Sequence, residues 1–165
     1  MLDEIKKQLT EYEIANITNE NFGQIFSVYD TNQDFFMLTQ GKKATIESSI
    51  SDIEAIPPNC VIAQKLYIGI WENDKAIGVL DIIQEYPEQT SFWIGLLLIN
   101  GISHSKGIGS KIVCAILNAA KIAGYKSAQL GVIDTNAKGI AFWQKHGFST
   151  FRNSGNIVVM SKSIV

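Results

Sequence analysis

The sequence predicts a mixed α/β fold, in which a central sheet carries helices on both of its sides. Residues 65–83, KLYIGIWENDKAIGVLDII, read as two strands joined by the turn Glu72-Asn73-Asp74, which predicts an antiparallel hairpin. Farther along, an apolar stretch at 90–99, a helical pattern and a strand at 126–134 follow one another, an order typical of a β-α-β unit. The hairpin and this unit together predict a sheet of mixed strand direction.

Length and composition predict one globular domain over residues 1–165. The chain has 46% hydrophobic and 18% charged residues, and its net charge is -2. It has no stripe of Lys and Arg, so we expect no binding to nucleic acid or to an anionic membrane. The start, MLDEIKKQLT, lacks the apolar core of a signal peptide, and no apolar run reaches the length of a membrane span. We therefore expect a soluble, cytoplasmic protein.

The elements before the hairpin are predicted from partial periodicities. Residues 11–17 alternate in part and predict a first strand. Asn19 is the expected cap of a helix that runs to about Tyr29, because apolar residues in this stretch share one helical face. Isoleucines repeat over 44–55 and predict a second helix. The segment between these two helices, DTNQDFFMLTQGKK, is largely polar and is assigned no element.

The second half of the chain has clearer patterns. The strand expected at 90–99 is apolar at both odd and even positions, which indicates a strand covered on both faces. A helix follows it, and Gly124 is its natural stop. The apolar face of that helix is formed by Ile108, Ile112, Ile116 and Ala120. The remaining predicted elements are a strand at 126–134, a helix at 136–146 and a last strand at 156–160.

The segment INGISHSKGIGSKI (99–112) places Gly107 and Gly109 at the start of that helix. Glycine costs a helix about 1 kcal/mol relative to alanine at each position, so we expect a functional reason for it. A helix N-terminus offers unpaired N–H groups and a partial positive charge, which suit a pyrophosphate. Lys106 and Lys111 are expected to add positive charge. An ordinary turn between two core elements is the alternative.

The glycine segment matches neither of two common nucleotide motifs. It lacks the Walker A pattern, and Ile112 occupies the place of the third glycine of a dinucleotide-binding fingerprint. The segment resembles the acyl-CoA loop of the GNAT acetyltransferase superfamily, Gln/Arg-x-x-Gly-x-Gly/Ala after the fourth strand. Residues 136–148, NAKGIAFWQKHGF, are similar to a second element of that family, Asn-x-x-Ala-x-x-Phe-Tyr-x-Lys-x-Gly-Phe. They begin 29 residues after Gly107, which leaves room for one helix and one strand.

The resemblance implies the GNAT fold, a mixed and mostly antiparallel sheet whose fourth and fifth strands splay apart. It implies acetyl-CoA as co-substrate, no metal, and direct transfer of the acetyl group to a primary amine in a ternary complex. The acceptor is expected to be a small molecule or a peptide N-terminus. A backbone N–H near Leu97 or Leu98 is expected to polarise the acyl carbonyl, and Leu98 is the residue assigned. Contacts with the co-substrate are expected from Leu97, Leu98, Ile99, His104, Ser105, Lys106, Gly107, Ile108, Gly109, Ser110, Asn136 and Trp143.

Two positions depart from the family pattern. His104 stands where the loop usually has Gln or Arg, and its ring either faces solvent or contacts phosphate. Trp143 stands where the family often has the Tyr that protonates the leaving thiolate. An indole N–H is no useful acid, so another group or water protonates the thiolate, or the thiolate leaves unaided.

The base for the acceptor amine is the least defined part of the prediction. No acidic residue lies on the strand at 90–99, and the candidates are Glu85, placed first, and Asp81 on the preceding strand. Asp30 and Asp34 are expected either to attract a cationic amine or to be plain surface charges. An aromatic lining of the acceptor pocket, with core packing as the alternative, is expected from Phe35, Phe36 and Trp93.

Two other classes of function stay open on the sequence alone. One is a non-catalytic acyl-CoA-binding regulatory protein, suggested by Trp143 and the missing carboxylate; the other is a nucleotide-binding α/β domain. A monomer and a homodimer are both compatible with the sequence. Cys60 and Cys114 have no metal-ligand spacing to either histidine, so we expect buried free thiols and no metal site.

Overall fold

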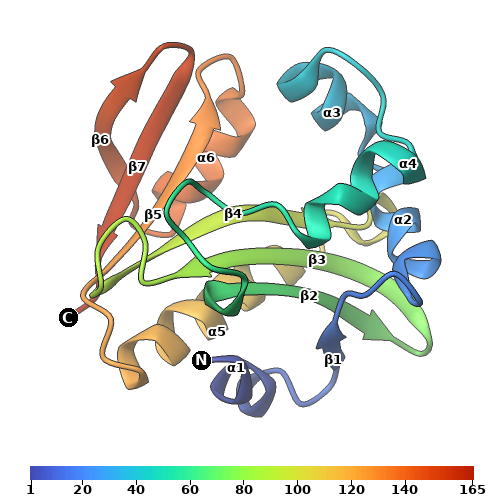
Figure 1. Ribbon diagram of the computed structural model, residues 1–165, viewed down its shortest axis with the longest axis horizontal. Helices are drawn as coiled ribbons and strands as arrows, with labels where there is room; N and C mark the ends of the chain where they lie inside the picture. Colours follow the sequence, from blue (N-terminus) through green and yellow to red (C-terminus); the bar gives the residue numbers. More distant parts are fainter.

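A seven-stranded sheet organises the structure, with its strands in the order β1-β2-β3-β4-β5-β7-β6 (Figure 1). The computed structural model describes residues 1–165. All neighbouring strands pair antiparallel except β4 and β5, which are parallel. The predicted mixed, mostly antiparallel sheet is therefore confirmed. The strands are β1 Glu13–Asn16, β2 Lys65–Glu72, β3 Lys75–Gln84, β4 Ser91–Ile99, β5 Ser127–Ile133, β6 Ser149–Ser154 and β7 Ile157–Ser163.

Helices cover both faces of the sheet. In Figure 1, α1 and α5 lie on one side of strands β2 to β4, and α2, α3 and α4 lie on the other. α6 follows β5 and precedes the hairpin of β6 and β7. The α-helices are α1 Leu2–Gln8, α2 Phe22–Asp30, α3 Gln33–Gln40, α4 Ile46–Ser49, α5 Ile108–Ile122 and α6 Ala137–Lys145. Three short 3₁₀ segments are η1 Ile50–Ile53, η2 Ile62–Gln64 and η3 Gly101–Ser103.

Two hydrophobic clusters fill the space between the sheet and its helices. The larger one joins α1 and α5 to one face, and the smaller one joins α2 and α3 to the other. Successive side chains of a strand point to opposite faces, so Leu80 of β3 lies in the larger cluster and Val79 in the smaller one. By the same alternation, Asp81 points to the α2 side of the sheet.

β2 and β3 form the hairpin that the sequence predicts. Glu72 pairs with Lys75, and the two residues between them, Asn73 and Asp74, have φ values of 49° and 62°. Two consecutive positive φ angles are what a type I′ turn requires, and Asn and Asp tolerate them better than other non-glycine residues.

β4 and β5 separate part of the way along their length. Their parallel pairing runs from Ser91 and Ser127 to Ile94 and Leu130. Beyond that point β4 continues to Ile99 and β5 to Ile133, but they no longer pair with each other. The splayed fourth and fifth strands implied by the family resemblance are therefore present.

The N-terminal part of the chain differs from the prediction in three places. α1 was not predicted, although Ile5 on it is fully buried against α5. α3 forms within the segment that was assigned no element, because Phe36 is buried and stacks on Tyr29 with ring centroids 5.2 Å apart. The helix predicted over 44–55 is wrong in form. It is a single α-turn followed by a 3₁₀ segment, in a stretch rich in serine, whose side chains compete for backbone hydrogen bonds.

Smaller differences concern helix caps and the last strands. The residue before α2 is Asn21 and not Asn19. β6 was missed because its residues are all exposed, so it has no apolar alternation. β7 runs beyond the predicted 156–160. The free thiol of Cys114 is exposed and that of Cys60 is half-buried, so the expectation that both are buried is wrong.

None of the helices combines the length and the apolar character needed to cross a membrane. No three side chains of His, Cys, Asp or Glu lie together in an arrangement that could hold a metal ion.

Candidate functional site

A cavity of about 710 Å³ opens beside the end of β4 and the start of α5. We call it the loop cavity. It is bounded by β4, by the loop between η3 and α5, and by α6. Its lining residues are Asn32, Phe35, Leu97, Leu98, Ile99, Ser103, His104, Ser105, Gly107, Ile108, Gly109, Ser110, Asn136, Lys138, Gly139, Phe142, Trp143 and Lys145.

The start of α5 presents free backbone N–H groups to this cavity. Gly107 is the N-cap residue with a φ of 79°, a left-handed conformation that favours glycine. No acceptor in the chain bonds the N–H groups of Ile108, Gly109 and Ser110. Unpaired N–H groups at the positive end of a helix dipole suit an anion such as a phosphate. A Cβ at Gly109 would lie 3.5 Å from the ring of Phe142, which is an ordinary van der Waals contact.

The hydrogen-bonding pattern of β4 shows which of its backbone groups face the cavity. The N–H of Asn100 bonds the carbonyl of Ile77 on the β3 side. Backbone groups alternate in direction along an antiparallel pair, so Leu98, which pairs with Val79, also directs its N–H to β3. Leu97 directs its N–H away from β3, to the side that β5 has left. The expected contact of the Leu98 N–H with the acyl carbonyl does not fit this geometry, because that N–H is directed to β3. The N–H of Leu97 faces the cavity instead.

The end of β4 is held by two side chains that converge on one carbonyl. Nε2 of His104 lies 2.7 Å from the carbonyl oxygen of Ile99, and Nδ2 of Asn32 donates to the same oxygen at 2.8 Å. The His104 ring therefore turns back to the end of β4, although the residue lines the cavity. The Ile99 carbonyl has both of its acceptor positions occupied and is not free for a ligand.

Positive charge reaches the loop cavity from lysines other than those predicted. Lys111 forms an ion pair with Glu11 and lies over the ring of Tyr12, so it points away from the cavity. Lys106 is exposed and does not line the cavity. Lys138 and Lys145 on α6 line it instead. Both lysines belong to the 136–148 segment that the sequence analysis had already singled out. Their place in this motif could therefore have identified them as cavity residues.

The side chain of Asn136 has the capping role that the helix start requires. Its Oδ1 accepts a hydrogen bond of 2.9 Å from the N–H of Gly139, and this caps α6. Trp143 is 9% exposed and packs edge-on against Phe142 and Phe148. Its indole is therefore a fixed wall of the site.

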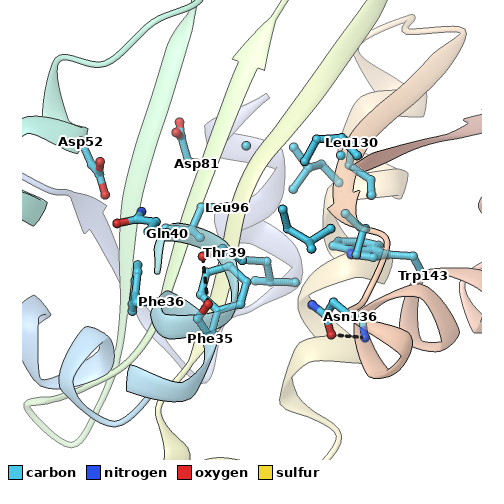
Figure 2. A pocket seen from close by; sticks show the side chains of 18 residues that line it. Phe35, Phe36, Thr39, Gln40, Asp52, Asp81, Leu96, Leu130, Asn136 and Trp143 are labelled. Carbon is cyan, nitrogen blue, oxygen red and sulfur yellow. Dashed lines mark hydrogen bonds between the residues drawn. The ribbon is translucent and has the colours of Figure 1, made fainter. Parts of the chain in front are cut away.

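A second cavity, of about 390 Å³, lies on the α2 side of the sheet where β4 and β5 have separated. We call it the sheet cavity (Figure 2). It is lined by Phe35, Phe36, Thr39, Gln40, Asp52, Asp81, Ile94, Gly95, Leu96, Leu97, Leu130, Gly131, Val132, Ile133, Asn136, Gly139, Trp143 and Ile157. The two cavities adjoin, because they share Phe35, Leu97, Asn136, Gly139 and Trp143.

Asp81 is the carboxylate of the sheet cavity that lies nearest in the sheet to Leu97. It pairs with Leu96 across β3 and β4, and Ile82 pairs with Ile94, so Gly95 bulges out of the ladder between them. A Cβ at Gly95 would lie 3.0 Å from Oδ2 of Asp81. A side chain at position 95 would therefore force the carboxylate of Asp81 to shift.

The negative charge of Asp81 is partly balanced by the buried side chain of Lys65. Nζ of Lys65 lies 2.8 Å from Oδ2 of Asp81, and the two side chains are 2% and 16% exposed. Oδ1 of Asp81 is buried and has no hydrogen-bond partner in the chain. Burial raises the pKa of Asp81, and Lys65 opposes the shift.

A second carboxylate, Asp52 from η1, lines the same cavity. Its Oδ2 accepts a hydrogen bond of 2.9 Å from the hydroxyl of Tyr29, which also contacts the hydroxyl of Tyr67. Burial raises the pKa of Asp52 and of both tyrosines, so the tyrosine hydroxyls stay protonated at neutral pH. Asp52 was not predicted, because it lies in a segment whose fold brings it to the sheet from a distant part of the chain.

The other acidic and aromatic candidates lie elsewhere. Glu85 is exposed in the β3–β4 connection and lines neither cavity. Of the two candidate bases, the geometry therefore favours Asp81 over Glu85, which the sequence analysis placed first. Asp30 and Asp34 are exposed and line neither cavity. Trp93 is also absent from both linings and packs against Tyr86 with ring centroids 6.0 Å apart. Phe35 and Phe36 line the sheet cavity and also pack in the smaller hydrophobic cluster, so both of the expected interpretations apply.

Comparison with known sequences gives a family match. The model of the acetyltransferase (GNAT) family matches residues 25–148, which include β2 to β5 and both cavity-forming helices α5 and α6. No curated protein sequence matches the chain.

Solved structures of low sequence identity share the fold. An acetyltransferase from Thermus thermophilus superposes with a TM-score of 0.79 at 21% identity, over 92% of this chain and 96% of that one. The PaiA N-acetyltransferase from Thermoplasma acidophilum, in complex with coenzyme A, gives 0.72 at 19% identity over 92% and 98%. The ribosomal-protein-S18-alanine N-acetyltransferase from Escherichia coli gives 0.65 at 11% identity over 93% and 94%.

Proposed function

Because the chain belongs to the GNAT acetyltransferase family, we propose that it transfers an acetyl group from acetyl-CoA to a primary amine, directly within a ternary complex. The proposal takes residues 1–165 as a single acetyltransferase domain. The observation that carries it is the junction of the two cavities at Leu97, which lines both of them and directs its N–H away from β3. A donor in one cavity and an acceptor in the other would meet at this residue.

The loop cavity has the properties that acetyl-CoA requires. The free N–H groups at the start of α5 suit the pyrophosphate, and Lys138 and Lys145 add positive charge. The unpaired edge of β4 beyond Ile94 suits the amide groups of the pantetheine arm, which bind as an added strand would. Acetyl-CoA supplies the acetyl group as a thioester. The solved structure of the PaiA enzyme with coenzyme A supports this assignment by its fold.

The N–H of Leu97 is proposed to donate a hydrogen bond to the acyl oxygen. Negative charge develops on this oxygen as the amine attacks, and a fixed backbone donor stabilises it. The N–H is held in place because β4 stays paired to β3 on its other edge. No side chain is needed for this part of the reaction.

Asp81 is proposed to accept the proton of the acceptor amine. An alkyl amine has a pKa of about 10.4, so forming the neutral amine at pH 7 costs about 4–5 kcal/mol. Oδ1 of Asp81 has no hydrogen-bond partner in the chain, and Lys65, which donates to Oδ2, opposes the rise in the Asp81 pKa that burial causes. Glu85 is not part of this proposal, because it lines neither cavity.

No acidic side chain is proposed for the leaving thiolate. Trp143 lines both cavities, but an indole does not donate its proton to a thiolate. None of the tyrosines lines either cavity. With a thiol pKa of about 8.5, departure as a thiolate that water then protonates costs little at neutral pH.

The sheet cavity supports a small primary amine as the acceptor. A volume of about 390 Å³ lies within the usual range for small-molecule sites. A peptide N-terminus is the second acceptor class, since the Escherichia coli neighbour acetylates the alanine of ribosomal protein S18. No role for nucleic acid or for a membrane surface is proposed.

The test is acetyl transfer itself. Wild-type protein, acetyl-CoA and a panel of primary amines and short peptides are mixed, and free thiol and acetylated product are measured together. Equal amounts of thiol and acetylated amine are expected with wild type, and a much lower rate with Asp81→Asn. Tight binding of acetyl-CoA without transfer to any amine or peptide would contradict the proposed function.

A further inference from the structure

We propose that Asp52 selects the acceptor by binding a second cationic group, while the nitrogen at Asp81 receives the acetyl group. This inference rests on the proposed function and adds the class of substrate to it. The acceptor is then a diamine, or an amine with another positive group on the same carbon chain. An amine with a carboxylate at that place is disfavoured.

The charge balance of the sheet cavity is the first observation. Two carboxylates, Asp52 and Asp81, line the cavity, and no Lys, Arg or His lines it. The nearest cation, Lys65, lies behind Asp81 with a side chain that is 2% exposed. Nζ of Lys65 already donates to Asp81 and to the carbonyl oxygen of Ala55. One carboxylate of the cavity therefore has no cation bonded to it.

The surroundings of Asp52 identify it as the carboxylate that has no bonded cation, although Lys65 acts on it at longer range. Its one hydrogen bond comes from the neutral hydroxyl of Tyr29, and it forms no ion pair. A partly buried carboxylate without a cation is costly, and a bound ammonium would remove that cost. A neutral or anionic ligand would leave the cost in place.

The two carboxylates reach the cavity from different elements. Asp81 is therefore placed to meet the nitrogen that is acetylated, and Asp52 to bind the second cationic group. Asp81 is on β3, across from Leu96 and next to the Gly95 bulge, so it lies beside the proposed acyl position at Leu97. Asp52 comes from η1, outside the sheet, and lines the sheet cavity without lining the loop cavity. Figure 2 shows the two carboxylates as separate groups in the cavity.

The rest of the lining suits a hydrocarbon chain between two nitrogens. Apolar side chains from three different elements, Phe36, Leu96 and Val132, line the sheet cavity together with the two carboxylates. A chain of methylene groups can lie against these side chains without leaving a polar group unpaired.

The experiment compares three linear acceptors that differ only at the far end of the chain. Each has one primary amine, and the far end is an ammonium, a methyl group or a carboxylate, in lengths from three to six carbons. A charge-assisted contact changes affinity by about tenfold or more, so wild type is expected to have the highest kcat/KM for the diamine. The alkylamine follows at about one tenth of that value, and the amino acid gives the lowest.

Asp52→Asn is the variant that separates charge from shape. The ratio of kcat/KM for the diamine to that for the alkylamine is expected to fall about tenfold, through KM. Tyr29→Phe removes the hydrogen bond to Asp52 but keeps its carboxylate, so the ratio is expected to remain. Glu54→Gln changes an exposed carboxylate of the same segment that lines neither cavity, and it is the matched control.

The outcomes distinguish the inference from the function on which it rests. Transfer by wild type to alkylamine and diamine with equal kcat/KM would overturn the inference and leave the acetyltransferase intact. The inference would also be overturned if Asp52→Asn kept the wild-type ratio of diamine to alkylamine kcat/KM. The same conclusion would follow if Tyr29→Phe lowered this ratio as much as Asp52→Asn does. Absence of transfer to every amine, with acetyl-CoA bound, would overturn the proposed function and the inference together.

Discussion

The ion pair of Lys65 and Asp81 allows a quantitative prediction about the pH dependence of acetyl transfer. Lys65→Met removes a cation that lies 2.8 Å from Oδ2 of a carboxylate whose side chain is 16% exposed. A hydrogen bond to a charged group contributes about 1.5–3 kcal/mol, which corresponds to about 1–2 pKa units. Burial already raises the pKa of Asp81, and Lys65 opposes that shift, so its loss raises the pKa further.

The sign of the effect on activity follows from the role proposed for Asp81. Below its pKa the carboxyl group is protonated and accepts no proton, so kcat/KM falls on the acidic side. In Lys65→Met this acidic limb is expected to move up by about 1–2 pH units. The assay is free-thiol release at saturating acetyl-CoA over a range of pH, with folding checked by circular dichroism. Glu85→Gln is the control, and its profile is expected to match wild type because Glu85 is exposed and lines neither cavity.

The same substitution also changes the pH dependence of stability, which gives an independent check. A carboxyl group whose pKa is higher in the folded state binds its proton more tightly there, so stability falls as pH rises through that pKa. Lys65→Met is therefore expected to lose unfolding free energy between acidic and neutral pH more steeply than wild type. An acidic limb that stays at the wild-type pH in a folded Lys65→Met protein would refute the assignment of Asp81 as the base.

Three further substitutions test other parts of the site. Gly109→Glu puts bulk and negative charge at the start of α5, so its affinity for coenzyme A, measured by calorimetry, should fall at least about tenfold. The fall should be larger than in the uncharged control Gly109→Gln. Equal affinities of the two variants would contradict the phosphate site. Gly95→Ala places a Cβ 3.0 Å from Oδ2 of Asp81, so it should lower kcat with little change in the affinity for coenzyme A; a wild-type kcat would show that the position of this carboxylate does not matter. His104→Ala removes one of two donors to the Ile99 carbonyl, so chemical denaturation should show a loss of about 0.5–1.5 kcal/mol while coenzyme A still binds; a loss of binding would mean that the ring contacts phosphate.

The part of the fold that the sequence predicts well is the part governed by local pattern. The hairpin of β2 and β3 has turn residues that fit one turn type, and α5 has an apolar face of regular period. Residues of the two segments with family motifs, 99–112 and 136–148, line the loop cavity together. These features depend on residues close together in the chain, so a single sequence contains them.

The features that sequence reasoning missed depend on tertiary contacts. α3 is stabilised by the burial of Phe36 against Tyr29, and β6 is an edge strand whose exposed residues give no pattern. Asp52 reaches the sheet cavity only because the segment before β2 folds back over the sheet. Asp81 was ranked below Glu85 because its distance to β4 depends on register and on the Gly95 bulge, neither of which is visible in the sequence.

The central claim, direct acetyl transfer from acetyl-CoA to a primary amine in the joined cavities, is tested most directly by following the acetyl group in a single turnover. Protein in excess is mixed with acetyl-CoA carrying an isotopic label in the acetyl group, with and without an alkyl diamine, and the masses of amine and protein are measured over time. The prediction is that the label appears on the amine at the rate of thiol release and never on the protein. Without amine, no rapid release of the free thiol is expected. Labelled protein that forms before the labelled amine, or thiol release without acetylated amine, would contradict it.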